Sequence, residues 1–354
     1  MKGIRVLMTG AGAPGAPGII HCYRNNSERD IFVLGVDVKD KVSTQRLLDD
    51  FKSIPNAQDS LFLETLLNIA IENKIDIIQP LVTKELEVLS VNTEKFLRKG
   101  IKICVNTKNV LNIANDKGKM LKSLAVQGIT CPRFLIISKK EDFKEACYKM
   151  GFPSVPICFK PTKANGSRGF RVIDESINRE DLLFNHKPNS VYISFPEALQ
   201  IIENCKSFPE LLVMEYMPGV EYSIDMLVDK GKAIYTIPRR RDLMSGGISV
   251  DCTVCNEKDV IDYSKMVASV LKLEGNVGIQ VRRDIDGKVK ILEINPRVQG
   301  SIVCCAAAGI NMPYFGIKYH LGEEISIIPV KWGTRMIRHW EEEYYDANGR
   351  PFTY

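Results

Sequence analysis

The residues with the clearest capacity for metal and phosphate chemistry are Glu293, Asn295 and Arg297, which follow a β-rich run over residues 288–294. In a strand, residues two apart share a face, so Glu293 and Asn295 are expected to point to the same side. Hard oxygen ligands beside a cation suit a magnesium–phosphate site, because Mg²⁺ is usually held by one or two carboxylates and by substrate phosphates. The alternative is a polar strand end that runs into a turn at Pro296.

Gln280 lies on the strand predicted before this motif and is separated from it by the Asp286-Gly287 turn. If the hairpin has the right register, Gln280 comes close to Glu293 and Asn295. The three side chains would then supply three oxygen ligands for one or two Mg²⁺ ions.

A candidate phosphate site begins at Lys160, after an apolar strand predicted over residues 155–159. The flexible loop that follows contains Gly166, Ser167 and Arg168. Such a loop can close over phosphates with backbone N–H groups and point charges. It is not a Walker loop, because the chain contains no Gly-x-x-x-x-Gly-Lys-Ser/Thr run. A plain surface hairpin is the alternative.

A candidate adenine site lies at Glu215, Tyr216 and Met217, where a buried apolar strand gives way to a Pro-Gly turn and then to a strand that carries Glu221. Backbone groups at such a break can pair with an adenine edge, and Glu221 can accept hydrogen bonds from ribose hydroxyls. A simple hairpin is the alternative. Farther along, residues 239–241 are three arginines, which either line the phosphate region or form a solvated basic turn.

The glycine-rich segment 10–15 offers a competing motif. It follows the first predicted strand, and Asp37 ends the next strand about 22 residues later, as in a dinucleotide fingerprint. The loop continues through residues 16–18, which delays the helix whose N-terminus should hold a pyrophosphate. NAD(P) binding is therefore the weaker reading, and a tight turn in an α/β unit is the other.

The elements that must position these residues follow two different patterns of predicted secondary structure. The first hundred residues alternate buried apolar runs with helix-like stretches, which predicts a parallel, doubly wound Rossmann-like sheet. After about residue 132 the pattern becomes β-rich with long loops, which predicts an α+β unit. The strands expected are 4–9, 31–37, 75–80, 101–105, 134–137, 155–161, 211–215, 222–228, 233–237, 277–282 and 288–294, and the main helices are 84–98, 116–126, 141–150, 195–205 and 260–272.

The composition is that of a globular protein with two or three units: 354 residues, 45% hydrophobic and 26% charged. The net charge of +5 is spread along the chain, so no nucleic-acid partner is expected. No signal peptide or span of about 20 apolar residues is visible, so no membrane association is expected. Most of the ten cysteines lie in apolar runs as free thiols, and a cytoplasmic location follows.

Taken in order, these motifs resemble the ATP-grasp superfamily, and in particular single-module relatives of the carbamoyl phosphate synthase large subunit. The resemblance covers nearly the whole chain. It implies that Lys117, in Asp116-Lys117 ahead of Gly-Ile-Thr-Cys-Pro, contacts a nucleotide phosphate. It also implies that Lys160 is the second phosphate-binding lysine and Arg297 the arginine that steadies the transferred phosphate. The remaining matches are the loop residues Gly166, Ser167 and Arg168, the adenine linker Glu215, Tyr216 and Met217, the ribose acid Glu221, and the metal ligands Gln280, Glu293 and Asn295.

The resemblance implies a pre-ATP-grasp domain over residues 1–114, an ATP-grasp domain over 115–330 with a lid subdomain at about 133–215, and a C-terminal extension over 331–354. It also implies ATP and Mg²⁺ as cofactors, with Mn²⁺ as an alternative ion, and a homodimer by analogy. The implied reaction forms an acyl phosphate from a small-molecule carboxylate and transfers the acyl group to an amine or similar nucleophile. Many relatives have a carboxylate at the position of Gln280, so this ligand is the least secure of the three.

Three other functions are compatible with the sequence. A partial carbamoyl phosphate synthase would act with a partner that supplies ammonia. An NAD(P)-dependent oxidoreductase would use Gly12 of the N-terminal loop and would not depend on Lys160. A non-catalytic nucleotide-binding module would bind ATP without releasing ADP.

Overall fold

The computed structural model describes residues 1–164, 166, 168–186, 191–245, 247–339, 341–342, 344–347 and 350–352. The chain forms two compact units. The first combines Met1–Asn112, Tyr222–Ile279 and Ile294–Tyr354, and the second combines Ile113–Glu221 and Gln280–Glu293. Each unit is thus assembled from separated stretches of sequence. The domain boundaries suggested by the sequence remain predictions.

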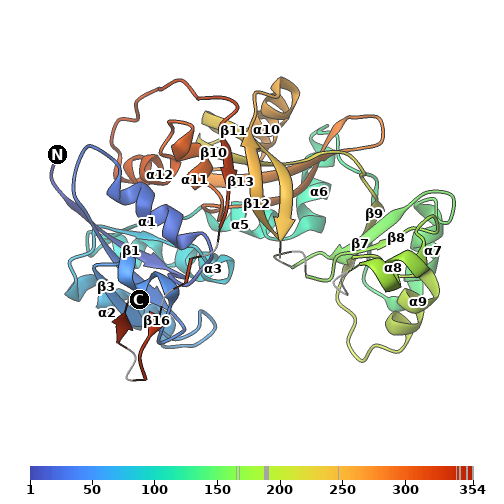
Figure 1. The fold of residues 1–354 in the computed structure, drawn as a ribbon, viewed down its shortest axis with the longest axis horizontal. Helices are drawn as coiled ribbons and strands as arrows, with labels where there is room; N and C mark the ends of the chain where they lie inside the picture. The colour runs from blue at the N-terminus through green and yellow to red at the C-terminus, as the bar shows by residue number, and fades with distance from the viewer. Residues whose placement is uncertain are drawn as a thin grey trace. The chain divides into compact units, whose positions relative to one another are not determined.

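The first part of the first unit is a parallel sheet of five strands in the order β3-β2-β1-β4-β5 (Figure 1). Its central strand β1 has four fully buried positions in succession, as expected for a strand covered on both faces. The elements are β1 (Ile4–Thr9), α1 (Ala16–Arg24), β2 (Ile31–Asp37), the 3₁₀ helix η1 (Ser43–Leu47), β3 (Asp50–Ser53), α2 (Phe62–Glu72), β4 (Ile77–Gln79), α3 (Thr83–Val91), α4 (Thr93–Leu97) and β5 (Lys102–Ile103).

The helix after the glycine-rich loop begins earlier than the sequence suggested. Helix α1 starts at Ala16, with Gly15 as its N-cap and Pro17 in its first turn. The prediction that residues 16–18 delay this helix is therefore wrong. Proline is well tolerated in the first turn, because the N–H that it lacks has no intrahelical partner there.

The rest of the first unit contributes most of a six-stranded sheet in the order β14-β13-β10-β11-β12-β15. Residues from β1, α1 and β2 share one hydrophobic core with residues from β11, β12, α11 and α12, so the two parts of this unit fold as one body. The end of β13 and most of β14 belong to the second unit. The elements from residue 221 onward are β10 (Glu221–Asp229), β11 (Lys232–Ser245), β12 (Ile248–Val254), α10 (Lys258–Leu271), β13 (Gly275–Arg283), β14 (Val289–Asn295), α11 (Val303–Ala307), α12 (Met312–Leu321), β15 (Arg335–Ile337), β16 (Tyr344–Tyr345) and β17 (Pro351–Phe352).

The second unit contains an antiparallel sheet in the order β6-β9-β7-β8, and α7, α8 and α9 gather beside it (Figure 1). Its core joins the sheet to α7 and α9 through Phe143, Phe159 and Ile202. The elements from residue 108 onward are α5 (Lys108–Ala114), α6 (Lys117–Val126), β6 (Phe134–Ile137), the 3₁₀ helix η2 (Lys140–Asp142), α7 (Phe143–Lys149), β7 (Ile157–Pro161), β8 (Arg171–Ile173), α8 (Arg179–Asn185), α9 (Phe195–Glu203) and β9 (Leu211–Glu215).

The predicted fold class is confirmed: a parallel, Rossmann-like α/β sheet is followed by a mixed α+β part. Several predicted elements differ by a few residues at their ends, and two differ more. The helix expected over residues 84–98 is two helices that meet at Asn92. The strand expected over 233–237 continues to Ser245, because its polar second half pairs with β12.

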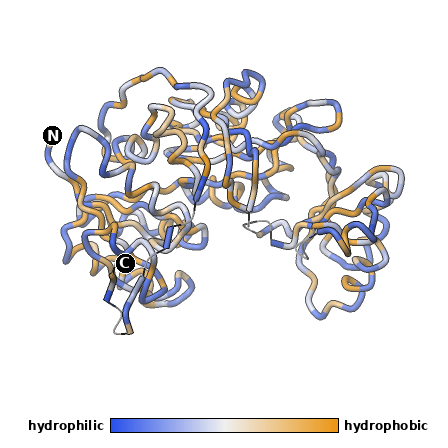
Figure 2. The backbone as a smooth tube through the Cα atoms, in the orientation of Figure 1, coloured by the Kyte–Doolittle hydropathy of each residue, from blue (hydrophilic) through white to orange (hydrophobic). Residues whose placement is uncertain are grey.

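Among the described residues, no helix is both long and apolar enough to cross a membrane. Hydrophobic stretches of the chain are short and are interrupted by hydrophilic residues in both units (Figure 2). All ten cysteines are free, and those in apolar runs, such as Cys104, Cys158 and Cys304, are buried as predicted.

Candidate functional site

The predicted phosphate-binding lysines lie together in the second unit. Asp116 caps α6 by accepting a hydrogen bond from Lys119 N at 3.0 Å, which fixes Lys117 in the first turn of the helix. Lys117 Nζ lies 3.5 Å from Glu293 Oε2 and donates to the carbonyl oxygen of Ala164, at the start of the predicted phosphate loop. Lys117 and Glu293, far apart in the sequence, thus form one polar cluster.

Lys160 completes this cluster at the end of β7. Its side chain is buried, and its Nζ donates to the carbonyl oxygen of Leu292 at 3.3 Å. Burial lowers the pKa of Lys160, the positive charge of Lys117 lowers it further, and the carboxylate of Glu293 opposes both effects. Two cations therefore lie beside the carboxylate of Glu293 in a protected environment, and the carboxylate of Glu221 also acts on Lys160. Ammonium groups held in this way can bind the oxygens of an anionic ligand such as a polyphosphate.

The predicted metal ligands occupy two strands. Gln280 lies on β13, and Glu293 and Asn295 lie on β14. Along β14, Glu293 and Asn295 are partly exposed and Ile294 between them is buried, which is the alternation that the sequence predicted. That Gln280, Glu293 and Asn295 bind a metal ion remains a prediction.

The donor set at these positions suits a hard cation more than a transition metal. It consists of one carboxylate and two carboxamides, and oxygen ligands of this kind are typical of Mg²⁺ sites. Over the described part of the chain, no three His, Cys, Asp or Glu side chains are grouped to hold a metal ion. The Glu293 side chain is 23% exposed and paired with Lys117, so a cation that also binds phosphate can reach it.

The side chain of Glu215 holds the predicted adenine linker in place. Its Oε1 accepts from Lys290 Nζ at 2.6 Å and from Arg133 N at 2.9 Å, and its Oε2 accepts from Arg133 Nε at 3.2 Å. Lys290 also pairs with Asp284 at 2.9 Å. Both carboxylate oxygens of Glu215 are thus used within the protein, so a contact from this residue to adenine would come from its backbone.

The rest of the linker presents one partly exposed aromatic ring and one buried thioether. Met217 is buried, whereas Tyr216 lies under the guanidinium of Arg282, with 5.5 Å between the guanidinium carbon and the ring centroid. Arg282 also donates from Nε to the carbonyl oxygen of Gly219 at 3.0 Å. Glu221 begins β10 and is close enough to Lys160 to act on its pKa.

Sequence reasoning missed Arg133, Arg282 and Lys290, which fix the linker. Arg282 lies two residues after Gln280, so the period of two was the available signal for Arg282. Lys290 lies an odd number of positions before Glu293, so the same period gave no signal for it. Arg133 offers no such signal, because it reaches Glu215 only when β6 pairs with β9.

The predicted phosphate loop is only partly described. Gly166 has a positive φ of 63°, which favours glycine, and Arg168 is exposed. Ser167 lies outside the described residues.

Arg297 lies in the first unit, after the end of β14. Its Nε donates to Thr83 Oγ1 at 3.0 Å and its Nη1 to the carbonyl oxygen of Val298 at 2.8 Å. Thr83 is in the first turn of α3, beyond the carboxyl end of β4. In parallel α/β sheets this edge is where ligands usually bind.

The glycine-rich loop belongs to the same region of the first unit. Gly12 N donates to Asp37 Oδ2 at 2.9 Å, so the acid expected to hold a ribose is engaged by the loop itself. A Cβ atom on Gly15 would lie 2.4 Å from the Cα of Gly300. The loop therefore needs glycine at residue 15 for close packing against the segment that follows Arg297. This requirement supports the interpretation of the glycine-rich motif as a tight turn in an α/β unit.

The three arginines at residues 239–241 form neither a phosphate-lining segment nor a solvated turn as a group, because they lie on β11. Arg239 is fully buried, and its Nε donates to Asp225 Oδ2 at 2.6 Å. Arg240 pairs with Asp242 and Arg241 donates to the carbonyl oxygen of Gly247, both at the surface. The three arginines are adjacent and chemically identical in the sequence, but the fold buries the first and leaves the other two at the surface.

Comparison with protein families gives two matches. Residues 6–104 match the family "PylC-like, N-terminal domain". Residues 207–342 match the family "ATP-grasp in the biosynthetic pathway with Ter operon".

A curated relative is the carbamoyl phosphate synthase large chain of Caldanaerobacter subterraneus, which is 23% identical over 253 residues. The match covers 68% of this chain but only 22% of the relative. The chain thus spans about a fifth of the length of that relative.

Solved structures share the fold across most of the chain. N5-carboxyaminoimidazole synthetase from Staphylococcus aureus, complexed with ADP, matches with a TM-score of 0.66 at 14% identity, over 91% of this chain and 78% of the other. The biotin carboxylase domain dimer of Hydrogenobacter thermophilus 2-oxoglutarate carboxylase, with MgADP, ADP and bicarbonate, matches with a TM-score of 0.67 at 16% identity, over 94% and 73%. At such identities the likeness establishes the fold.

Proposed function

We propose that this chain is an ATP-grasp relative of the carbamoyl phosphate synthase large chain, and that it is an ADP-forming ligase that joins a carboxylate to an amine or similar nucleophile. The observation that carries the proposal is the cluster of Lys117, Lys160 and Glu293. Two buried or nearly buried ammonium groups with one close carboxylate suit a polyphosphate. Their burial also strengthens each interaction with a phosphate oxygen.

The proposed reaction has two steps. A carboxylate oxygen of the first substrate attacks the γ-phosphorus of ATP, and the bond from that phosphorus to the bridging oxygen of ADP breaks. The nucleophile then attacks the acyl carbon of the resulting acyl phosphate, loses a proton, and phosphate leaves. In both steps Lys117, Lys160 and Arg297 offset negative charge on the phosphoryl group, which is the main demand of phosphoryl transfer.

Gln280, Glu293 and Asn295 would hold the metal ion, Mg²⁺ or Mn²⁺. When bound, the ion supplies charge neutralisation at the phosphate oxygens. Glu293 would be a ligand of the ion, and Lys117, which pairs with Glu293 in this structure, would contact a phosphate oxygen. Tyr216 and Met217 would line the adenine, Glu221 would accept from the ribose, and Gly166, Ser167 and Arg168 would cover the phosphates.

The test is a screen for ADP release with purified protein, MgATP, and panels of small carboxylates and amines that include bicarbonate with ammonia. We expect ADP release that requires one carboxylate and is lost in Lys160→Met. Lys144→Met is the matched control, because it removes an exposed lysine of the same unit and should retain activity. ATP binding without ADP release under any condition would favour a non-catalytic module.

The alternatives give different results in the same screen. A partial carbamoyl phosphate synthase would release ADP with bicarbonate and would need a partner for a nitrogen source. An NAD(P)-dependent enzyme would bind a nicotinamide nucleotide, lose that binding on substitution of Gly12, and be indifferent to Lys160→Met. The engagement of Asp37 by Gly12 N argues against that enzyme.

We further propose a homodimer in the cytoplasm without nucleic-acid or membrane partners. The dimeric biotin carboxylase domain among the fold neighbours supports the dimer. Light scattering coupled to size-exclusion chromatography gives the mass directly. A monomer at all concentrations would reject it.

A further inference from the structure

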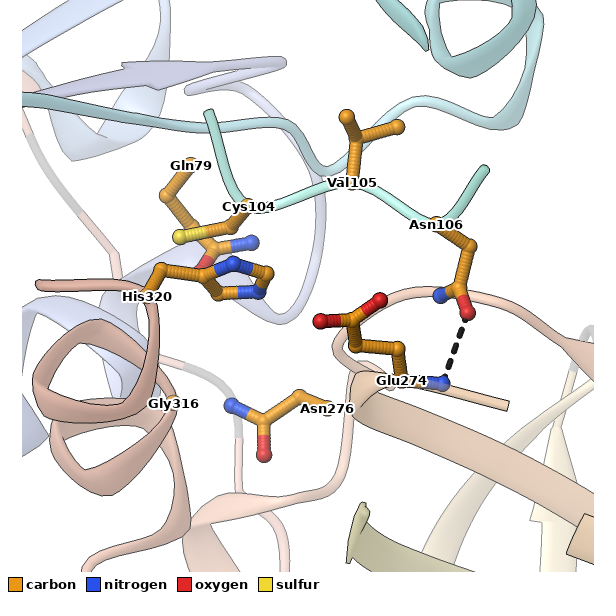
Figure 3. Close-up of a pocket in the computed structure, with 8 residues that line it drawn as sticks. All are labelled: Gln79, Cys104, Val105, Asn106, Glu274, Asn276, Gly316 and His320. Carbon is orange, nitrogen blue, oxygen red and sulfur yellow. Dashed lines mark hydrogen bonds between the residues drawn. The ribbon is translucent and has the colours of Figure 1, made fainter. Parts of the chain in front are cut away.

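A small internal cavity in the first unit is separate from the cluster of Lys117, Lys160 and Glu293. Its volume of about 10 Å³ accommodates one water-sized guest. The carboxylate of Glu274 points toward the imidazole ring of His320, and the side chains of Gln79, Cys104 and Asn276 lie around them (Figure 3). The lining is rich in polar atoms, and Gln79, Cys104, Asn106 and Asn276 are buried whereas Glu274 and His320 are partly exposed.

Two of these polar atoms have no hydrogen-bond donor among the described residues: Gln79 Oε1 and Asn276 Oδ1. Gln79 is 2% exposed and Asn276 is 8% exposed. The orientation of each amide is set by its NH₂ group, which donates to the carbonyl oxygen of Pro80 at 3.3 Å for Gln79 and of Met312 at 2.9 Å for Asn276. A buried acceptor without a donor is unfavourable, so these oxygens call for a guest that donates hydrogen bonds.

The charge around the cavity favours a cation as that guest. Glu274 supplies a carboxylate, and its Oε1 and Asp229 Oδ1 each lie 2.9 Å from the hydroxyl oxygen of Tyr319. One hydroxyl proton cannot serve two carboxylates fully. Burial, Glu274 and Asp229 all raise the pKa of Tyr319, so the hydroxyl keeps its proton and does not add a further negative charge.

His320 favours one type of cation. Burial, with a smaller effect of Lys102, lowers the pKa of His320 to about 4, so the imidazole is neutral at pH 7 and one ring nitrogen keeps a lone pair. Lys102 itself donates to the carbonyl oxygen of Leu321 at 3.0 Å. A nitrogen acceptor beside oxygen acceptors suits an N–H donor, whereas K⁺ and Na⁺ prefer oxygen ligands alone.

We propose that this cavity is a binding site for one ammonium ion, held by the oxygens of Gln79, Asn276 and Glu274 and by the imidazole of His320. An ammonium ion is about as large as a water molecule, carries four N–H donors, and accepts no hydrogen bond. It therefore matches an acceptor-rich cavity better than water, which has two donors.

The site is connected to the segment that carries Arg297. Asn106, also in the lining, accepts from Glu274 N at 2.8 Å and donates to the carbonyl oxygen of Pro296 at 3.4 Å. Ammonium in the cavity would stabilise Glu274 and, through Asn106, the backbone just before Arg297. The site does not depend on the proposed ligase activity, and it is tested without ATP.

The test compares melting temperatures of the full chain in ammonium, potassium, sodium and choline chloride at one ionic strength and pH 7. We expect a saturable increase of about 2 °C in ammonium over the other three salts. The increase should be absent in Gln79→Leu and Asn276→Leu. It should remain in Gln58→Leu, which removes an exposed amide from the same unit.

Equal melting temperatures in all four salts would overturn the site, and equal increases with ammonium and potassium would overturn its assignment to ammonium. An increase that persists in both cavity variants would also overturn it. If those variants do not fold, NMR with ¹⁵N-labelled ammonium decides the question on the wild type. Slowly exchanging ammonium protons support the site, and their absence at saturating ammonium overturns it.

Discussion

Arg239 in the first unit and Lys160 in the second are both buried cations, but they differ in their partners and in the direction of their pKa shifts. Arg239 has a carboxylate partner in contact, Asp225 at 2.6 Å, whose other oxygen accepts from Gln299 at 3.0 Å. Burial opposes the charged form of Arg239, but Asp225 outweighs it and the pKa rises. Among the described residues, Lys160 donates to the carbonyl oxygen of Leu292, and its pKa falls because burial and the charge of Lys117 outweigh the effects of Glu293 and Glu221.

This difference separates a structural charge from a binding charge. A buried ion whose partner is already present stabilises the fold only as part of that pair. A buried ion with too few partners raises the free energy of the unliganded protein, and a ligand of opposite charge recovers that energy. By this criterion Arg239 belongs to the scaffold, and we propose that Lys160 belongs to a binding site, although both lie at β-strand positions in basic stretches of the sequence.

The largest expected effect comes from breaking the satisfied pair. Asp225→Ala leaves Arg239 buried without its carboxylate, and we expect a loss of about 3–5 kcal/mol in the free energy of unfolding. Urea denaturation measures it. Asp251→Ala, which breaks an ion pair with the largely exposed Arg335, is the control and should cost about 1 kcal/mol or less. A similar small cost for Asp225→Ala would remove the basis for calling this pair structural.

A third buried ionisable residue, Glu85, extends the comparison, because we expect its carboxyl group to be protonated and neutral in the folded protein below about pH 7. It accepts a hydrogen bond from Thr9, and burial raises its pKa from 4.5 to about 7. The folded protein therefore keeps this proton up to about pH 7, whereas the unfolded chain releases it above about pH 4.5. Stability should fall as pH rises between these values, by up to about 3 kcal/mol.

Denaturation as a function of pH tests this expectation. Glu85→Gln lacks the titrating group and should lack this part of the pH dependence. Glu87→Gln, at an exposed position of the same helix, should behave as the wild type. Identical pH profiles for the wild type and Glu85→Gln would contradict the expectation.

Removing the carboxylate of the under-paired cluster should affect turnover more than folding. We expect Glu293→Gln to lower Mg-ATP turnover by about 100-fold, because it removes the single acid of the predicted metal set. Circular dichroism should show an unchanged fold. Full activity in this variant would show that Glu293 is not a metal ligand, whatever the reaction is.

The smallest of these effects concerns Lys160 itself. Lys160→Met should weaken ATP binding by about tenfold, and it should leave the unfolding free energy unchanged or slightly higher, because a buried charge is removed. Calorimetric titration with ATP and urea denaturation give the two values. Lys144→Met should change neither. A large loss of stability without loss of affinity would place Lys160 with Arg239 as a structural residue.

Local sequence patterns predicted much of the framework. The strands at Ile4–Thr9, Ile31–Asp37, Phe134–Ile137 and Leu211–Glu215 have the predicted bounds, because each is a short apolar run between breaking residues. The second half of β11 was not predicted, because its polar residues form a strand only by pairing with β12. Helix α1 was placed late because residues 16–18 were taken as a continuation of the glycine-rich loop, although the first turn of a helix accepts Pro17.

The sequence by itself determined the fold class, the order of the motifs and the types of residue available for phosphate and metal chemistry, because these depend on local periodicity and on side-chain chemistry. Tertiary structure alone decided how each charge is used. It brought Lys117 to Glu293 across 176 residues of chain, engaged both oxygens of Glu215, and buried Arg239 against Asp225. The reason is that the role of an ionisable group depends on its burial and its partners, and both are set by residues distant in the sequence.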